Sequence, residues 1–230
     1  VSPKIREMVV EAQKIATDKK LLIHCWRGGL RSQSVAGLLK VAGIEVSVLE
    51  GGYKAYRTWV LNSFEKPYRF QVLGGMTGSG KTEVLHLLNE AGEEIIDLEK
   101  IADHRGSSFG RLGTDGRITQ AQFENELANQ LFQKEKHRIW LEDESRQIGT
   151  LIIPASIWKQ MIEAPFVFLN PHLPYRVNKL IEDYGSFEVS EIRDAIDRIK
   201  KRLGGLRHRQ AMDLLNEGNK VVLVKMLMQY

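Results

Sequence analysis

The sequence feature that most constrains the fold is a glycine-rich loop between a predicted strand and a predicted helix. The loop reads Gly-Met-Thr-Gly-Ser-Gly-Lys-Thr and matches the phosphate-loop pattern G-x-x-x-x-G-K-[ST] at every position. Such loops bind a di- or triphosphate through backbone N–H groups, while the lysine reaches the terminal phosphates and the threonine ligates Mg²⁺. We therefore predict a phosphate-binding site formed by Gly75, Met76, Thr77, Gly78, Ser79, Gly80, Lys81 and Thr82.

A second loop carries Cys25, the single cysteine of the chain, directly after a short apolar run that predicts a buried strand. Backbone N–H groups, the N-terminus of the following helix and two arginines all favour the thiolate form of this cysteine. We predict that Cys25 is catalytic and that an anion cradle surrounds it, formed by Trp26, Arg27, Gly28, Gly29, Leu30, Arg31 and Ser32. The spacing H-C-x5-R-S also occurs in cysteine-dependent phosphatases, and rhodanese sulfurtransferases share the loop geometry, so the loop alone leaves the reaction open.

The order of the predicted elements indicates an α/β protein with two parts. Strands are expected at 21–24, 46–49, 69–73, 94–98, 138–142 and 166–169, and helices at 3–18, 34–41, 53–64, 82–91, 119–136 and 154–162. This alternation predicts a parallel sheet covered on both faces. Residues 1–66 form one predicted domain and residues 67–230 the other, whose pattern turns helical from about Pro171, with 221–224 ambiguous between strand and helix.

Charge is distributed unevenly along the chain, whose formal net charge is +4. Residues 1–66 carry 11 Lys/Arg against 6 Asp/Glu, and residues 198–209 carry six basic residues and no acidic one. Such a run can contact RNA phosphates, although a solvated helix end is an equal alternative. The RNA contacts that we predict are Arg198, Lys200, Lys201, Arg202, Arg207 and Arg209.

The single cysteine excludes an internal disulfide, and we find neither a signal-peptide pattern nor an apolar run long enough to span a membrane. A free thiol in such a chain predicts a cytoplasmic protein without a membrane partner. The sequence does not predict an oligomeric state.

Further polar residues are candidates for the same site as the phosphate loop. Asp97 and Asp143 end predicted strands, at the edge where an open parallel sheet binds its ligands. A polar loop at 103–117 has the length of a binding loop. The residues that we predict to contact substrate or Mg²⁺ are Asp97, His104, Arg105, Ser107, Ser108, Asp143, Glu144 and Arg146.

Several segments together resemble the tRNA 2-selenouridine synthases, in which a rhodanese-type domain is fused to a P-loop domain. They are residues 25–32, 49–57 (Leu-Glu-Gly-Gly-Tyr-Lys-Ala-Tyr-Arg), 74–82, 104–110 (His-Arg-Gly-Ser-Ser-Phe-Gly) and 142–149 (Glu-Asp-Glu-Ser-Arg-Gln-Ile-Gly). The resemblance covers nearly the whole chain. A complete rhodanese domain has more sequence before its cysteine than 24 residues, so we expect the N-terminal part of that domain to be missing.

The resemblance implies a tRNA-modifying transferase that replaces the sulfur of wobble 2-thiouridine with selenium through an S-geranylated intermediate. It implies selenophosphate and geranyl diphosphate as co-substrates, with Cys25 handling the selenium. We infer that the loop at 75–82 binds the diphosphate of the geranyl donor, with Mg²⁺ as a further expectation. The alternatives are a cysteine-dependent phosphatase, a P-loop small-molecule kinase with a rhodanese-like module, and an RNA-binding module without catalysis.

Overall fold

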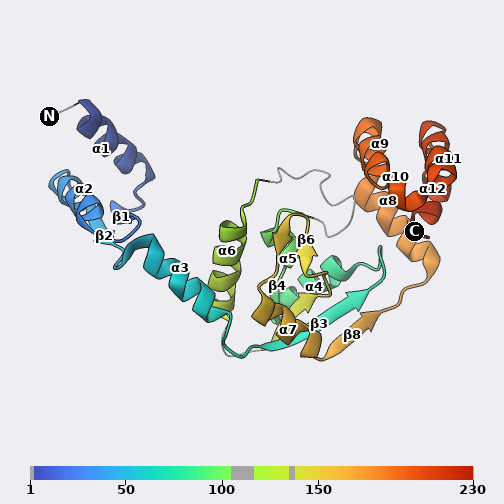
Figure 1. The fold of residues 1–230 in the computed structure, drawn as a ribbon, viewed down its shortest axis with the longest axis horizontal. Helices are drawn as coiled ribbons and strands as arrows, with labels where there is room; N and C mark the ends of the chain where they lie inside the picture. The colour runs from blue at the N-terminus through green and yellow to red at the C-terminus, as the bar shows by residue number, and fades with distance from the viewer. Residues whose placement is uncertain (1–2, 105–116, 135–137, 230) are drawn as a thin grey trace. The chain divides into compact units, whose positions relative to one another are not determined.

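A computed structural model describes residues 3–104, 117–134 and 138–229 of the chain (Figure 1). The chain divides into two compact units, residues 1–63 and 64–230, which are described separately below. Among the described residues, no helix combines the length and the apolar character needed to cross a membrane.

The first unit is a small α/β layer. Its elements are α1 (Pro3–Ile15), β1 (Lys20–Ile23), α2 (Leu30–Val41), β2 (Glu45–Val48) and α3 (Gly52–Ser63). The two strands are parallel, with Leu21 paired to Val46. Ala12 of α1, Ala36 and Leu39 of α2 and Val46 of β2 share one apolar core, so both helices pack on the strand pair that presents the cysteine loop.

The second unit is built on a four-stranded parallel sheet with the order β4-β5-β3-β8. These strands are β3 (Arg69–Gly75), β4 (Glu94–Ile96), β5 (Arg138–Glu142) and β8 (Phe166–Leu169). Helices α4 (Lys81–Glu90), α6 (Gln120–Gln133) and α7 (Ala155–Glu163) contact the sheet, and short α5 (Leu98–Ile101) contacts α6. Because β3 lies inside the sheet, the loop that follows it has a strand on either side.

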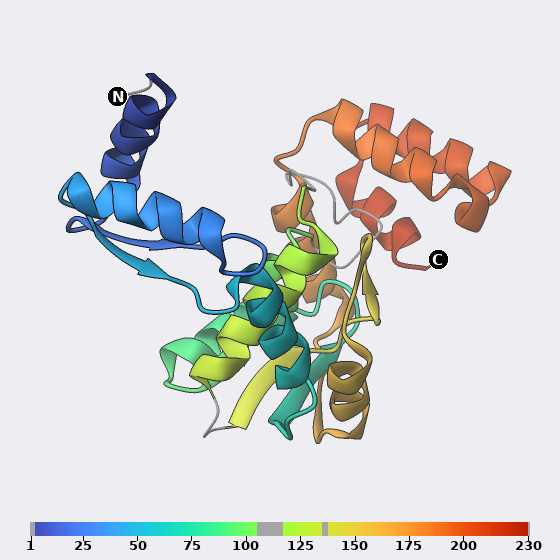
Figure 2. The ribbon, with the colours of Figure 1, turned by 60° about the vertical axis from the view of Figure 1, so that its left-hand side comes forward.

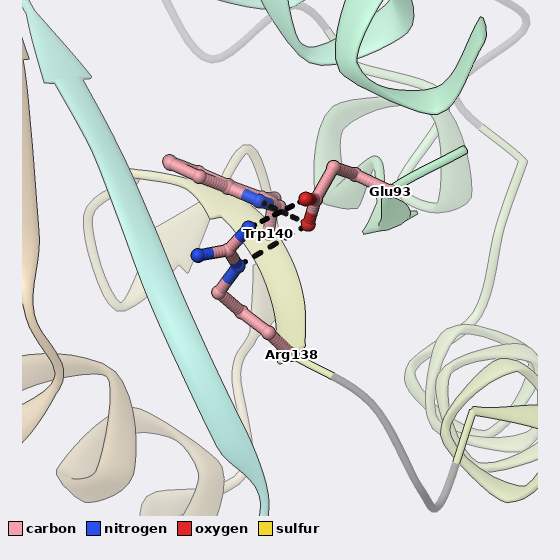
Figure 3. Close-up of polar contacts among 3 residues, drawn as sticks. All are labelled: Glu93, Arg138 and Trp140. Atoms are coloured by element: carbon pink, nitrogen blue, oxygen red, sulfur yellow. Dashed lines mark hydrogen bonds and ion pairs between the residues drawn. The ribbon is translucent and has the colours of Figure 1, made fainter. Parts of the chain in front are cut away.

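A polar cluster fixes the beginning of β5, the end of the strand that lies away from the phosphate loop (Figure 3). Glu93, just before β4, accepts hydrogen bonds from Arg138 Nε at 3.2 Å and from Trp140 Nε1 at 3.0 Å. The bonds from Arg138 and then Trp140 hold the pKa of the Glu93 carboxyl below its ordinary value. This cluster joins β4 to β5 at the sheet edge opposite the phosphate loop and has a structural role.

A small hairpin and five helices complete the second unit. Strands β6 (Gln147–Ile148) and β7 (Leu151–Ile152) form an antiparallel pair. The helices, coloured orange to red in Figure 2, are α8 (Leu173–Tyr184), α9 (Val189–Arg198), α10 (Lys200–Leu203), α11 (Gly205–Asn216) and α12 (Lys220–Leu227). They have an apolar core of their own, which includes Ile196, Leu203, Leu215 and Leu223.

The structure confirms the predicted α/β class with a parallel sheet and a helical C-terminal part, and it corrects several element boundaries. The helix after the cysteine begins at Leu30 rather than residue 34, because the cradle itself forms its first turn. β4 ends at Ile96, because the side chain of Asp97 accepts a bond from Lys100 N and starts α5. The ambiguous segment 221–224 is helical, within α12.

Candidate functional site

Cys25 lies in the loop between β1 and α2, with its thiol beside the first turn of the helix. Its Sγ lies 3.4 Å from Ser32 Oγ, which is also 2.9 Å from Gly29 O, so the one hydroxyl proton of Ser32 can be donated to either acceptor. The Ser32 hydroxyl, followed by the backbone N–H of Arg27, lowers the pKa of the Cys25 thiol to about 6, while burial acts in the opposite direction. At neutral pH the sulfur is therefore mainly thiolate, the form that acts as a nucleophile.

The turn after β2 determines the shape of the cysteine loop. Gly28 has φ +65°, and a Cβ there would lie 2.7 Å from Gly52 N. Gly52 has φ +63°, and a Cβ there would collide with Cys25 O and with Gly28 N. Tyr53 N donates to Cys25 O at 3.0 Å and Lys54 N to Trp26 O at 2.9 Å. The glycines at these two positions are required by this close approach of the two backbones.

The side chains of the cradle are mostly exposed around the thiol. Trp26 has 54% of its surface exposed, and Arg27, Leu30 and Arg31 are also exposed. The Tyr53 ring lies 5.7 Å from the Trp26 ring and 5.7 Å from the His24 ring, measured between centroids. The loop thus combines a thiolate, two guanidinium groups and aromatic faces. The predicted cradle residues lie on one loop and on the first turn of α2, because they are consecutive in the sequence.

The phosphate loop links β3 to α4. Gly78 and Gly80 have φ +76° and +77°, a backbone conformation that disfavours other residues. Lys81 Nζ lies across the loop and donates to Gly75 O at 3.2 Å. The hydroxyl of Ser79 is buried and has no hydrogen-bond partner among the described residues. The loop therefore carries the positive charge of Lys81 and, in Ser79, a buried hydroxyl without a hydrogen-bond partner among the described residues.

Helix α8 packs over this loop and brings a cation that sequence reasoning missed. Arg176 Nε donates to Thr77 O at 3.0 Å, and a Cβ at Gly78 would lie 2.6 Å from Arg176 O. Lys179, one turn further along α8, forms an ion pair with Glu83 of α4 at 3.4 Å. Arg176 lies about a hundred positions from the loop, so no local sequence pattern connects the two.

Three carboxylates beside the phosphate loop form a cluster that could hold a cation. One oxygen from each of Glu99, Glu142 and Glu144 lies within 4.8 Å of the others. Glu142 is 2% exposed, and its Oε1 has no hydrogen-bond partner among the described residues. Burial raises the pKa of Glu142 to about 7, although a hydrogen bond from Thr82 and the charge of Lys81 act to lower it. Burial also raises the pKa of Glu99 and of Glu144, which share a hydrogen bond.

This cluster differs in part from the acids that the sequence analysis selected. Glu144 belongs to it, whereas Glu99 and Glu142 were missed, although Glu142 ends the strand next to β3. Asp143 is exposed and donates through its backbone N to Leu73 O at 2.9 Å. Asp97 is buried, and its Oδ2 lies 3.1 Å from Nε2 of His86.

The remaining predicted contacts are dispersed. His104 follows α5, and its ring lies 2.8 Å from where a Cβ at Gly149 would be. Arg146 is exposed next to the β6–β7 hairpin. Arg105, Ser107 and Ser108 lie outside the described residues.

The predicted RNA contacts lie on three successive helices of the C-terminal bundle. Arg198 ends α9, Lys200, Lys201 and Arg202 lie on α10, and Arg207 and Arg209 lie on α11. All six side chains are exposed, while Ile199 and Leu203 between them enter the core. The run is therefore amphipathic, with its charge directed away from the bundle.

Comparison with known proteins identifies the family of the chain. The profile described as the tRNA 2-selenouridine synthase AAA domain matches residues 68–224, which include the phosphate loop and the carboxylate cluster. The chain belongs to the tRNA 2-selenouridine synthase family. The match covers the sheet and most of the C-terminal helices, so the family is defined here by the second unit.

Similar curated proteins extend over both units. The tRNA 2-selenouridine synthase of Pseudomonas fluorescens Pf-5 is 39% identical over an alignment 216 positions long, which covers 84% of this chain and 58% of that protein. The synthase of Pseudomonas syringae pv. syringae B728a is 39% identical over 217 residues, with the same coverage. That of P. fluorescens Pf0-1 is 36% identical over an alignment 242 positions long, which covers 94% of this chain and 65% of the relative. The chain thus spans about three fifths of these relatives, and no solved structure matches it significantly.

Proposed function

We propose that this chain contains the reactive parts of an enzyme that converts wobble 2-thiouridine in tRNA to 2-selenouridine through an S-geranylated uridine. The names of the relatives describe a tRNA 2-selenouridine synthase, which supports the overall reaction. The observation that carries the proposal is the presence in one chain of an acidified thiol and a phosphate loop. A reaction with a selenium step and a diphosphate-releasing step needs both.

Cys25 handles the selenium, which selenophosphate donates. Its lowered thiol pKa supplies a nucleophilic sulfur at neutral pH. The exposed arginines of the cradle, Arg27 and Arg31, attract an anionic selenium donor, and the exposed Trp26 leaves the thiol open to a large substrate. These features support a role for the first unit in selenium transfer. We also propose that this unit is rhodanese-like.

The phosphate loop binds the diphosphate of geranyl diphosphate. Lys81 and Arg176 supply positive charge, and the backbone of residues 75–80 supplies N–H donors. As the sulfur of 2-thiouridine bonds to the geranyl carbon, the carbon–oxygen bond to the diphosphate breaks, and these groups stabilise the negative charge that gathers on the departing diphosphate. Binding by ATP or GTP would instead indicate a kinase-like role for this loop.

The carboxylate cluster fits Mg²⁺, which favours oxygen ligands beside a bound phosphate. The unpartnered Oε1 of Glu142 and the adjacent carboxylates of Glu99 and Glu144 would hold the ion, together with the Thr82 hydroxyl. When bound, Mg²⁺ neutralises phosphate charge. The chain's own contribution is to keep these acids close together, with Glu142 buried, where a cation relieves their mutual repulsion.

The RNA substrate is a tRNA, and the six exposed basic residues of α9–α11 contact its phosphates. Their shared exposure on one run supports this assignment. We place the protein in the cytoplasm, where its tRNA substrate is found.

The experiment that tests the proposal uses cells that lack this protein. Their tRNA is digested and its nucleosides are measured by mass spectrometry, with and without the complete wild-type protein supplied from a plasmid. We expect 2-selenouridine to disappear in the deletion and to return with the wild-type gene. Unchanged 2-selenouridine in the deletion strain would refute the proposed function.

A further inference from the structure

The second unit contains a cavity that the roles above do not use. It has a volume of about 620 Å³ and lies among α4, β4, α5 and α6. This volume lies in the range of small-molecule binding sites. Polar side chains that line it include His86, Asn89, Asp97 and Gln130.

The lining of the cavity combines carboxamides with isoleucines. Five of its thirteen lining residues are Asn or Gln, and three are isoleucines, Ile95, Ile101 and Ile118. A carboxamide offers one acceptor oxygen and two N–H donors, which complement the N3–H and O4 groups of a uracil ring. The charged lining residues balance, since Asp97 and Glu126 are matched by Lys100 and Lys134. This chemistry suits a neutral, planar, hydrogen-bonding ligand better than a polyanion.

His86 and Asp97 connect this cavity to the phosphate site. His86 Nε2 lies 3.1 Å from Asp97 Oδ2, and Asp97 Oδ1 accepts from Lys100 N at 2.8 Å, so the pair is held in place from two sides. His86 follows Thr82 by four residues on α4, which is about one helical turn. Asp97 is also close enough to Glu142 and Glu144 to interact electrostatically with both. A ligand in the cavity therefore touches α4, the helix whose first residues belong to the phosphate loop, and Asp97, which interacts with two of the three carboxylates.

We propose that this cavity binds one nucleoside of the RNA substrate, with a pyrimidine ring against the isoleucines and its polar edge on the carboxamides. The inference rests on the proposed function, because it takes the reacting uridine as the occupant. A base that reacts with a group held by the phosphate loop must leave the RNA stack and enter an adjacent pocket, and unstacked RNA bases are commonly recognised through their edges.

The first test locates the base directly. The complete protein is mixed with an anticodon stem-loop RNA that carries 4-thiouridine at the wobble position, irradiated and digested, and the crosslinked peptides are identified by mass spectrometry. We expect crosslinks within residues 81–101 or 118–134. Crosslinks confined to other parts of the chain would overturn the proposal. If 2-selenouridine still depends on the gene in that case, only the assignment of this cavity fails.

A matched pair of variants provides the second test. Gln130 lines the cavity, whereas Gln133 lies on the same helix, is exposed and does not line it. We expect Gln130→Ala with Asn89→Ala to weaken binding of the stem-loop about five- to ten-fold, since hydrogen bonds to the base are lost. Gln133→Ala should bind as the wild type does, and inorganic diphosphate should bind equally to all forms. Equal RNA affinity for the double variant and Gln133→Ala would overturn the proposal.

Discussion

The two loops of this chain use the same backbone device in different surroundings. Each follows a strand of a parallel sheet and leads into a helix, and each needs glycine with positive φ. The cysteine loop extends from a two-stranded sheet and is closed by the turn at Gly51 and Gly52. The phosphate loop extends from an inner strand of a four-stranded sheet and is covered by α8.

The surroundings decide what each loop can do. In the first loop, Ser32 and backbone N–H groups stabilise a negative charge that belongs to the protein itself, on Cys25. In the second, the cation Lys81 lies beside the buried Glu142 and the partly buried Glu144, to which the third carboxyl of the cluster is hydrogen-bonded. One loop therefore presents a nucleophile, and the other presents a site for an anionic ligand together with a cation. The geometry of such a loop therefore indicates anion binding, whereas the neighbouring side chains determine which reaction the loop can support.

The largest effect is expected at the phosphate loop. Lys81→Ala removes a charge that stabilises the departing diphosphate, so geranyl transfer should fall at least about a hundred-fold, and selenation with it. The measurement is formation of S-geranylated uridine and 2-selenouridine by the complete protein. Lys159→Ala, which changes an exposed lysine of α7, is the control. Full geranyl transfer by Lys81→Ala would mean that the loop has another task.

A change in the cysteine loop should separate the two activities, unlike Lys81→Ala, which should lose both. Cys25→Ser replaces the nucleophilic thiolate by a hydroxyl that stays neutral, so 2-selenouridine should fall below detection while S-geranylated uridine is still formed. Both nucleosides are measured in the same reaction. Loss of both products from a correctly folded variant would show that the two loops do not divide the reaction.

The carboxylate cluster should respond to a cation, whereas the cysteine loop should not. Mg²⁺ binding to the folded state should raise the melting temperature of the wild type by a few degrees at millimolar concentration. Glu142→Gln should lose this increase, because it removes a buried ligand. Asp143→Asn is the matched control, since its carboxyl is adjacent in sequence but exposed. Equal responses of both variants would exclude Glu142 from the Mg²⁺ site.

A smaller effect is expected when the hydrogen bond between Ser32 and Cys25 is removed, which measures how much this bond lowers the thiol pKa compared with the rest of the cradle. The folded-state pKa of Cys25 is lowered to about 6, so thiolate is lost as pH falls through that value. Ser32→Ala should raise this pKa by about one unit, because it removes the first of its causes. The pH dependence of iodoacetamide alkylation measures it, with Ser34→Ala as control, and Cys25 is the only thiol that can react. An unchanged midpoint would assign the acidity to the backbone N–H groups.

The smallest effect concerns the RNA. Each phosphate contact releases about one counterion, so the double change Lys200→Ala, Lys201→Ala should reduce the slope of log affinity against log salt by at most about two. The affinity for all tRNAs should weaken alike. If the slope stays as in the wild type, the basic residues around Cys25 become the better candidate for the RNA site. RNA binding would then belong to the first unit and not to the second.

Local pattern predicted most of the fold, because the strands and helices of this chain have clear periodicity and the two loops have contiguous signatures. The boundaries failed where side chains act as caps, as at Asp97, or where a loop forms the first turn of a helix, as at Leu30. The short hairpin β6–β7 was missed because two-residue strands have no periodicity.

The candidate site was predicted only where its residues are neighbours in sequence. Arg176 and Glu99 reach the phosphate loop through tertiary packing, which no spacing rule reveals. Glu142 carried a usable signal, since it ends a strand that neighbours β3, yet the adjacent Asp143 was selected instead. Alternation would not have distinguished them, because residues 139–142 are all buried, as expected of a parallel sheet covered on both faces.

The close approach of Gly28 and Gly52 has a consequence for how the thiol is kept ready. The carbonyls of Cys25 and Trp26 accept bonds from the first turn of α3, so the preorganisation of the loop depends on that helix as well as on β1. Fraying of the α3 N-terminus would release the loop backbone in the same event. Amide exchange at Tyr53 and Lys54 therefore reports the order of the thiol site, although neither residue bears any of its chemistry.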